Sequence, residues 1–562
     1  MSTTSEATPG STTEPKPTGD SARTGSAAHL VAAGILLSRI AGLVRDRIFA
    51  QFFGNSLYAS AFRAALRMPN VLQNLLGEGT LSASFIPVYA SLLERGEREA
   101  AGRLAGAIFA LLLATAGGLT LVGVIAAPVL VDIFFAGFQG ELRDITVACV
   151  RIIFPMTGIL VLSAWTLGIL NSHRKFFIAY FAPVLWNAAM IGTLLLLGGS
   201  LEQRALVIAL AWGALIGGAL QFGVQVPFML RLERQLKVGW RLRDANVRTV
   251  LGNAAPAILG RGVVQVSGWV DMLLASFLFV GAVASLGYAQ TLYILPVSLF
   301  GMSVAAAELP EMSREGGVDA EALRRRLEAG LRQIAILVVP SAIGYLILGD
   351  VVVAALYQTG EFQPSDTLLV ALVLAGYAVG LLASTATRLY SSAFYALRDT
   401  RTPARIAALR VLVAAALGVG LMLLLEGYAV RGGPIGFAPT PPVPDDATLD
   451  AYGPWRPLGA AGLALGTGLA AWVEWRILRR TLGRRIGGAG AGRPFVIRLV
   501  IAAAIAGAAG RSIAFMLPPL HPVLVAVLVL GPFGGVYFAA AHALGASEAT
   551  SQLRRVFRRL RR

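Results

Sequence analysis

The chain has 562 residues, of which 56% are hydrophobic and only 14% are charged, and its formal net charge is +17. Soluble proteins carry about 25% charged residues, so this composition indicates an integral membrane protein and excludes a disordered chain or a coiled coil. Cys149 is the only cysteine, which excludes an intrachain disulfide, a disulfide scaffold and a multi-cysteine zinc site.

Residues 1–27 are mostly Ser, Thr, Pro and Gly, and are expected to form a disordered cytoplasmic tail. Fourteen apolar stretches follow, each long enough to cross a hydrocarbon core of about 20 helical residues. The sequence therefore predicts an all-α polytopic membrane protein with about fourteen transmembrane helices. The predicted spans are 28–53, 68–93, 104–135, 145–170, 177–197, 205–230, 250–280, 286–309, 334–356, 368–397, 406–425, 458–478, 496–517 and 523–544.

Lys and Arg are concentrated in the even-numbered connections between these spans, and the connection after the sixth span alone carries Arg231, Arg234, Lys237, Arg241, Arg243 and Arg248. Because positive residues accumulate in cytoplasmic loops, both termini are expected to be cytoplasmic. The net charge then follows mostly from topology, and no nucleic-acid partner is expected.

Three segments outside the spans have distinct compositions. Residues 547–562 form a basic amphipathic cytoplasmic tail, which either lies on an anionic leaflet or only fixes topology. Residues 232–249 are a cytoplasmic linker. The Pro-rich run 432–457 is expected to be an outer connector.

Ionisable side chains inside the spans are candidates for function, because each costs about 2.5 to 3.5 kcal/mol at the bilayer centre on insertion scales. In the first span, Arg39 and Asp46 are seven residues apart and share a face, with Arg45 adjacent. The second span is expected to be one continuous helix with a polar stripe along it, formed by Arg67, Asn70, Asn74 and Glu78.

Two later spans add further polar groups. The seventh span holds Arg261 and Gln265 one turn apart, with Asp271 further along, and the tenth places Arg388 between Ser384 and Ser391. Together with the first two spans, they predict a cavity lined by arginines and fewer acids, which suits a phosphate or carboxylate substrate. The alternative is that arginines such as Arg45 and Arg67 extend to the membrane interface and only fix helix depth.

The two halves of the chain show weak internal symmetry. The fourth span ends in a basic turn at 171–176, and the tenth ends in a basic turn at 396–402; a proline follows near the start of each next span. Repeated halves around a midplane site are usual in secondary transporters.

Several motifs resemble a known family, in the order Ser38-Arg-Ile-Ala-Gly-Leu-Val-Arg-Asp46, Arg67-Met-Pro-Asn70, Glu78-Gly79, Phe85-Ile-Pro87, Leu356-Tyr-Gln-Thr-Gly-Glu-Phe362 and Phe394-Tyr-Ala-Leu-Arg-Asp-Thr-Arg-Thr-Pro403. They are similar to those of the MurJ/MviN lipid II flippases, part of the multidrug/oligosaccharidyl-lipid/polysaccharide exporter superfamily. The resemblance extends from about residue 28 to at least residue 480.

This resemblance implies two six-helix lobes around a central cavity, residues 28–231 (spans one to six) and 250–482 (spans seven to twelve). Spans thirteen and fourteen, within 483–546, would form a groove for the lipid tail. It also implies a multi-pass protein of the bacterial inner membrane that moves lipid II between leaflets by alternating access. The expected partners are lipid II, membrane lipids and proteins of peptidoglycan synthesis; no enzymatic activity, cofactor or metal is expected.

Residue by residue, the resemblance assigns substrate-binding or transport roles to Arg39, Arg45, Asp46, Glu78, Asp271 and Arg388. Arg67, Asn70 and Arg261 complete the candidate set on the strength of the intramembrane pattern. The chain departs from the family where Ser60 replaces an Asp, where Gln73 and Asn74 replace basic residues, and where Gln290 and Thr291 replace an Asp-Arg pair. Arg261 is hypothesised to restore one of the lost positive charges.

These departures leave alternatives open. The chain could be a flippase for another polyprenyl-diphosphate-linked glycan, or a non-transporting membrane scaffold of the same fold. A drug/cation antiporter of this fold would require a negatively charged cavity, which the arginines oppose. The energy source and ion coupling stay open.

Overall fold

Helices make up nearly all of the computed structural model, which describes residues 19–302, 304–305, 308, 312, 320–431, 437–439, 455–546 and 548. The basic tail predicted at 547–562 falls outside the described residues except for Glu548. Helix α1 begins at Gly19, inside the segment expected to be a disordered tail. Once a helix has nucleated, each further residue adds one hydrogen bond. The helix that forms in the apolar run can therefore extend backwards into this polar stretch.

The predicted spans of the first half all fall on helices. These helices are α1 (Gly19–Phe53), α2 (Leu57–Leu76), α3 (Glu78–Glu94), α4 (Arg98–Ile125), α5 (Ala127–Phe134), α6 (Gly140–Ser172), α7 (Phe176–Leu197) and α8 (Gln203–Leu232). The third predicted span is divided between α4 and α5 at Ala126.

The prediction of one continuous second span is wrong. Helix α2 starts at Leu57, where the Ser56 hydroxyl accepts a hydrogen bond from the Ala59 amide, and it ends at Leu76. Gly77 has non-helical dihedral angles (φ −85°, ψ −140°), and a Cβ there would lie 2.3 Å from the Gln73 carbonyl oxygen. Glu78 therefore begins a separate helix and does not continue the stripe of Arg67.

The second half contains α9 (Ala245–Ser276), α10 (Ala282–Pro296), the π-helix η1 (Val297–Met302), α12 (Ala320–Tyr357), α13 (Pro364–Val379), α14 (Leu381–Ala396), α15 (Arg401–Glu426), α16 (Gly459–Ile486), α17 (Arg493–Met516) and α18 (Pro522–Ala543). Helices α13 and α14 meet at Gly380 with a bend of 41°. Gly418 and Gly466 let α15 and α16 pack closely, since a Cβ on Gly466 would lie 2.5 Å from the Gly418 amide nitrogen.

The expected outer connector after α15 is partly a β-sheet. Strands β1 (Tyr428–Arg431), β2 (Phe437–Pro439) and β3 (Trp455–Pro457) pair antiparallel in the order β2-β1-β3. Arg456 of β3 donates from Nε to Asp366 Oδ1 of α13 at 2.7 Å, and both side chains are at least 94% buried. This buried ion pair links strand β3 of the sheet to helix α13.

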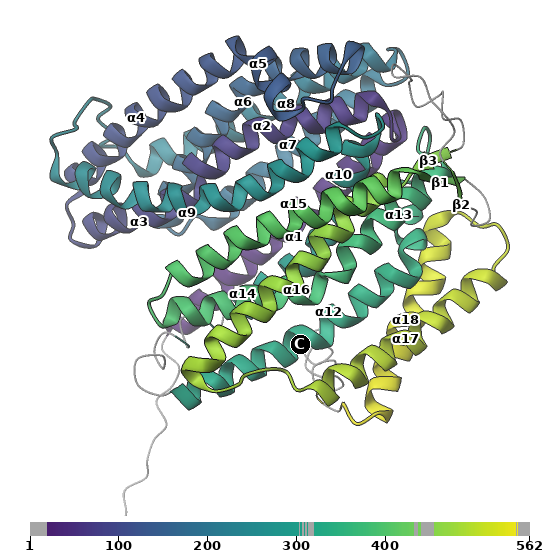
Figure 1. The fold of residues 1–562 in the computed structure, drawn as a ribbon. Coiled ribbons are helices and arrows are strands. Elements are labelled where there is room, and N and C mark those ends of the chain that lie inside the picture. Colours follow the sequence, from purple (N-terminus) through teal and green to yellow (C-terminus); the bar gives the residue numbers. More distant parts are fainter. Residues whose placement is uncertain are drawn as a thin grey trace, which may run out of the picture.

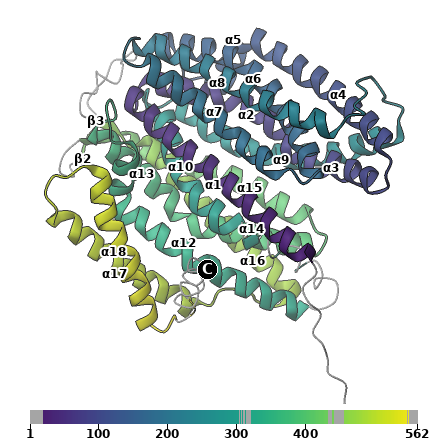
Figure 2. The same cartoon turned by 180° about the vertical axis from the view of Figure 1, so that it is seen from behind.

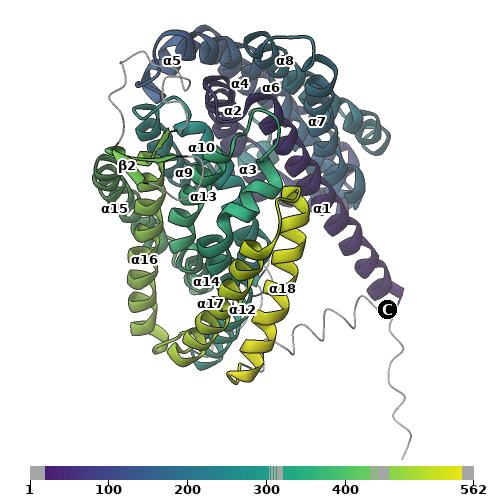
Figure 3. The ribbon, with the colours of Figure 1, turned by 90° about the vertical axis from the view of Figure 1, so that its right-hand side faces the viewer.

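The helices form two groups, seen one above the other in Figure 1. Helices α2 to α8 lie in one group, and α10 together with α12 to α18 lies in the other. Figure 2 shows α1 running diagonally between the groups, where it packs against α7 and also contacts α12. Helix α9 contacts α2 and α3 on one side and α15 on the other. Helices α17 and α18 pack against α12 at the periphery (Figure 3).

Nine described helices are long and apolar enough to cross a membrane, or ten if the bent pair α13 and α14 forms one span. The predicted count of fourteen is not confirmed by this criterion. Helices α2 and α16 are among those that fall short, because Arg63 and Arg67 on α2, and Glu474 and Arg476 on α16, dilute their apolar runs.

The two basic turns noted in the sequence have the same local geometry. Arg174 after α6 and Arg398 after α14 have φ of 58° and 59°, and they are the only described residues other than glycine with positive φ. In each turn the arginine amide donates three residues back and the next amide donates five residues back. Asp399 accepts from the Thr402 amide and hydroxyl, which, helped by Arg485, lower the pKa of Asp399 to about 2.

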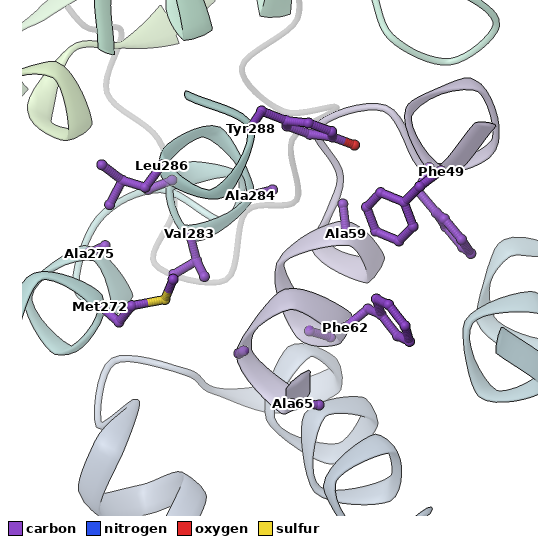
Figure 4. Close-up of a cluster of buried hydrophobic side chains, with 14 of the residues drawn as sticks. Phe49, Ala59, Phe62, Ala65, Met272, Ala275, Val283, Ala284, Leu286 and Tyr288 are labelled. Atoms are coloured by element: carbon purple, nitrogen blue, oxygen red, sulfur yellow. The ribbon is translucent and has the colours of Figure 1, made fainter. Parts of the chain in front are cut away.

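The largest apolar core lies where the two groups meet. Figure 4 shows Phe49 of α1, Phe62 of α2, Met272 of α9 and Tyr288 of α10 in this core. All four side chains are buried. The polar residues described next lie beside this core.

Candidate functional site

A first group of polar side chains surrounds Asp46 on α1, and is called the Asp46 cluster below. Asp46 is 4% exposed. Its carboxylate accepts hydrogen bonds from Arg45 Nη2 at 2.7 Å and Nε at 3.1 Å, and from the Thr291 hydroxyl at 3.2 Å. Arg45 also donates to the Asn187 side-chain oxygen at 3.1 Å and stacks on the Trp186 ring. The cluster therefore joins α1 to α7 and α10.

Arg63 on α2 completes the Asp46 cluster and was not among the predicted site residues. Its positive charge acts on the Asp46 carboxylate through space, and its Cζ lies 4.0 Å from the centroid of the Tyr288 ring. The sequence did contain a signal, because Arg63 precedes Arg67 by one helical turn. The second span was predicted to begin at residue 68, so Arg67 lay at its edge whereas Arg63 fell a full helical turn outside it.

A second group of charged side chains surrounds Asp271 on α9, and is called the Asp271 cluster below. Arg67 of α2 packs on α9 at Gly268, where a Cβ would collide with its guanidinium. Asp271, one turn further along α9, is 9% exposed, and the Thr467 hydroxyl of α16 lies 3.4 Å from both of its carboxylate oxygens. Arg67 and Arg410 of α15 are its electrostatic partners.

The Asp271 cluster continues to α14 through a buried acid. Arg410 Nη1 lies 3.5 Å from Glu474 Oε2, and Glu474 on α16 is 5% exposed. Arg388 on α14 interacts electrostatically with Glu474 and is itself exposed. The charges of Arg67, Asp271, Arg410, Glu474 and Arg388 thus alternate in sign from one helix group to the other. Arg410 and Glu474 lie inside the predicted spans 406–425 and 458–478 but were not among the predicted site residues. Only the packing of α15 against α16 shows that they contact each other.

The other predicted residues are placed differently. Arg39 lies on the exposed side of α1 and Asn70 is exposed on α2, so the structure does not bring Arg39 together with buried Asp46. Arg261 lies within α9 and Glu78 begins α3, and their side chains lie outside the described part of the chain. The hypothesis that Arg261 restores a positive charge stays a prediction.

Metal binding has no support within the described residues, which contain no group of three or more His, Cys, Asp or Glu side chains that could hold an ion. What the two clusters offer instead is delocalised positive charge. Arg45, Arg63, Arg67, Arg388 and Arg410 come from four helices on both sides of the junction. Guanidinium groups bind phosphate oxygens through two parallel hydrogen bonds.

Comparison with known proteins identifies the family. Residues 49–431 match the family described as "Lipid II flippase MurJ". The chain belongs to the lipid II flippase MurJ family. It is 32% identical over 450 residues to the probable lipid II flippase MurJ of Haemophilus influenzae, covering 76% of this chain and 84% of that protein. It is 33% identical over 402 residues to the lipid II flippase MurJ of Burkholderia cenocepacia, covering 70% and 77%.

Solved structures show the same fold. A lipid II flippase MurJ in an inward closed conformation superposes with a TM-score of 0.69 at 21% identity, covering 91% of this chain and 99% of that one. An inward-facing multidrug resistance MATE family transporter of the MOP superfamily gives a TM-score of 0.61 at 18% identity, covering 80% and 94%. MurJ membership and the apolar helices make this chain a multi-pass membrane protein.

Proposed function

We propose that this chain is a lipid II flippase, which moves the lipid-linked peptidoglycan precursor from the inner to the outer leaflet of the bacterial inner membrane by alternating access. The family match over residues 49–431 carries the proposal. Lipid II is a polyprenyl diphosphate that carries a disaccharide-pentapeptide, and its translocation breaks no bond. The protein therefore acts as a transporter and not as an enzyme.

The Asp46 and Asp271 clusters are the proposed headgroup site. A diphosphate that leaves water needs delocalised positive charge, and Arg45, Arg67 and Arg388 supply it from α1, α2 and α14. While the site is empty, Asp46 holds Arg45. Asp271 and Glu474 are the acidic partners of Arg67 and Arg388, respectively. Arg39, Asn70, Glu78 and Arg261 belong to the same proposed binding set.

The proposed organisation is two six-helix lobes, residues 28–231 and 250–482, that rock about the junction between the helix groups. Helices α17 and α18 are proposed to guide the lipid tail, because they carry many exposed large apolar side chains. These are Ile497, Val500, Ile501, Ile505, Phe515, Met516, Val523, Leu524, Val527 and Leu528. Both termini are proposed to be cytoplasmic, on the evidence of the Lys and Arg distribution.

A second candidate is a flippase for another polyprenyl-diphosphate-linked glycan. Ser60 and Thr291 are two of the five positions where the family resemblance implies charge and this chain carries a neutral group. Ser60 donates to the Val280 carbonyl at 2.6 Å, and Thr291 donates to Asp46. A headgroup that needs fewer charged contacts would be compatible with this change.

Complementation of a bacterial strain depleted of its own lipid II flippase tests the proposal. We expect the wild-type chain to restore lipid II to the outer leaflet, scored by extracellular labelling of lipid II and not by growth alone. A well-expressed, correctly inserted protein that leaves lipid II inside would contradict lipid II transport. Rescue on restoring an arginine at position 291 would then favour the second candidate, whereas no rescue would favour a scaffold.

A further inference from the structure

Arg63 has an unusual environment at the junction of the two helix groups. Its guanidinium carbon lies 4.0 Å from the centroid of the Tyr288 ring and 5.3 Å from that of the Phe49 ring. Gly287 makes room for it, since a Cβ there would lie 2.6 Å from Arg63 Cδ and 2.9 Å from its Nη1. The side chain is therefore held between α1, α2 and α10.

The hydrogen-bonding capacity of this guanidinium is only partly used, by an interaction with the Tyr288 side chain. Among the described residues, Arg63 Nε and Nη2 are buried and have no hydrogen-bond partner. Asp46 is close enough to interact electrostatically, but its oxygens already accept from Arg45 and Thr291. Aromatic faces attract a guanidinium, yet they do not replace hydrogen bonds to its buried N–H groups. Arg63 thus keeps unused donors in this conformation.

Arg63 lies in a seam that closes the two groups against each other, formed by residues 54–63 and 280–291. Ser60 donates to the Val280 carbonyl, and the Ala284 amide donates to the Ser60 hydroxyl at 3.3 Å. The Tyr288 hydroxyl donates to the Gly54 carbonyl at 2.7 Å. Separation of α2 from α10 would break these bonds and uncover the Arg63 guanidinium.

We propose that Arg63 is a diphosphate-binding residue that is stored between Tyr288 and Phe49 while this seam is closed, and that binds the substrate when the seam opens. The inference rests on the proposed transport of a polyprenyl diphosphate. The anion gains paired hydrogen bonds from Arg63 only in the open state, so substrate binding favours opening. Arg63 also supplies positive charge beside Asp46, where Thr291 brings none.

Translocation of purified lipid II in proteoliposomes tests this assignment with three variants. Arg63→Leu is expected to lower the rate by about 10-fold or more, the loss of one charge-assisted contact. Arg63→Lys keeps the positive charge but lacks the paired N–H donors of the guanidinium, so its translocation rate should lie between those of Arg63→Leu and wild type. Arg151→Leu, which removes an exposed arginine from α6, is the matched control and should leave the rate unchanged. A rate for Arg63→Leu equal to wild type would overturn the assignment.

A cross-linking experiment separates binding by Arg63 from a structural effect. In a Cys149→Ser background, the Ser60→Cys/Ala284→Cys pair places two thiols across the seam. We expect disulfide formation to slow several-fold when lipid II is added, and to become insensitive to lipid II in the Arg63→Leu protein. Equal protection by lipid II in both proteins would refute a role for Arg63 in opening. If the wild-type chain itself fails to move lipid II, the proposed function fails instead.

Discussion

Replacing Arg45 by alanine is expected to abolish lipid II translocation while the protein still inserts in the membrane. The substitution leaves the Asp46 carboxylate, 4% exposed, with only the Thr291 hydroxyl of its two hydrogen-bonding partners. Breaking a buried ion pair lowers the stability of the folded protein by about 3–5 kcal/mol. The substitution also removes a guanidinium that is proposed to bind the diphosphate. Because the folded protein then lacks this diphosphate-binding group, we expect the rate in proteoliposomes, per inserted molecule, to fall by more than about 100-fold.

Two further variants distinguish a loss of substrate binding by Arg45 from a loss of protein stability. Thr291→Val removes one neutral hydrogen bond to Asp46 and should lower the rate less than Arg45→Ala. The double variant Arg45→Leu/Asp46→Leu removes both charges, so it should recover stability but not transport. Transport by the double variant near the wild-type rate would show that the Asp46 cluster is structural only.

Replacing Asp366 by alanine is expected to cause a large loss of stability. The buried Arg456 guanidinium would lose the Asp366 carboxylate at 2.7 Å, while its hydrogen bond to the Trp455 carbonyl at 3.0 Å would stay. Asp366 also accepts from the Gln363 amide at 3.0 Å at the start of α13. We expect the free energy of unfolding in detergent to fall by about 3–5 kcal/mol, measured by denaturant or thermal unfolding.

The chain offers a matched comparison for this ion pair. Arg143 contacts Asp132 at 2.6 Å, but both side chains are substantially exposed. Exposed ion pairs contribute little to stability because water and salt screen them, so Asp132→Ala should change the free energy of unfolding little. The double variant Asp366→Leu/Arg456→Met should be more stable than Asp366→Ala alone. Similar losses for Asp366→Ala and Asp132→Ala would contradict the importance of burial.

The sequence predicted the helical membrane fold because a long apolar run is sufficient to indicate a span. Breaks in the helices within the predicted spans could not be predicted from hydropathy. Gly77 ends α2 through its backbone dihedral angles and its contact with the Gln73 carbonyl, neither of which hydropathy records. Likewise, the bend at Gly380 lies inside the apolar run 368–383, where hydropathy gives no sign of a break.

The candidate site was partly predictable from charge alone. Asp46, Arg45 and Asp271 were found because ionisable groups are costly inside a membrane. Partners such as Asn187 and Thr467 are common polar residues, and only the packing of α7 and α16 shows that they contact the charged groups. Arg39 and Asp46 are spaced as residues on one helix face, yet Arg39 is exposed. Helical periodicity could not predict this difference, because it does not say which part of a face a neighbouring helix covers.

The turns at Arg174 and Arg398, where φ is positive, bear on how the two halves of the chain become oriented in the membrane. A left-handed L-residue costs about 1–2 kcal/mol, but glycine at the same place would restore about 0.5–1 kcal/mol of entropy to the unfolded chain. The arginine therefore keeps a net cost of about 0.5–1 kcal/mol over glycine, which the value of its positive charge as an orientation signal can offset. If both turns face the cytoplasm as proposed, each half carries its own orientation signal at the same place. The first half can then adopt its orientation during synthesis before the second half exists.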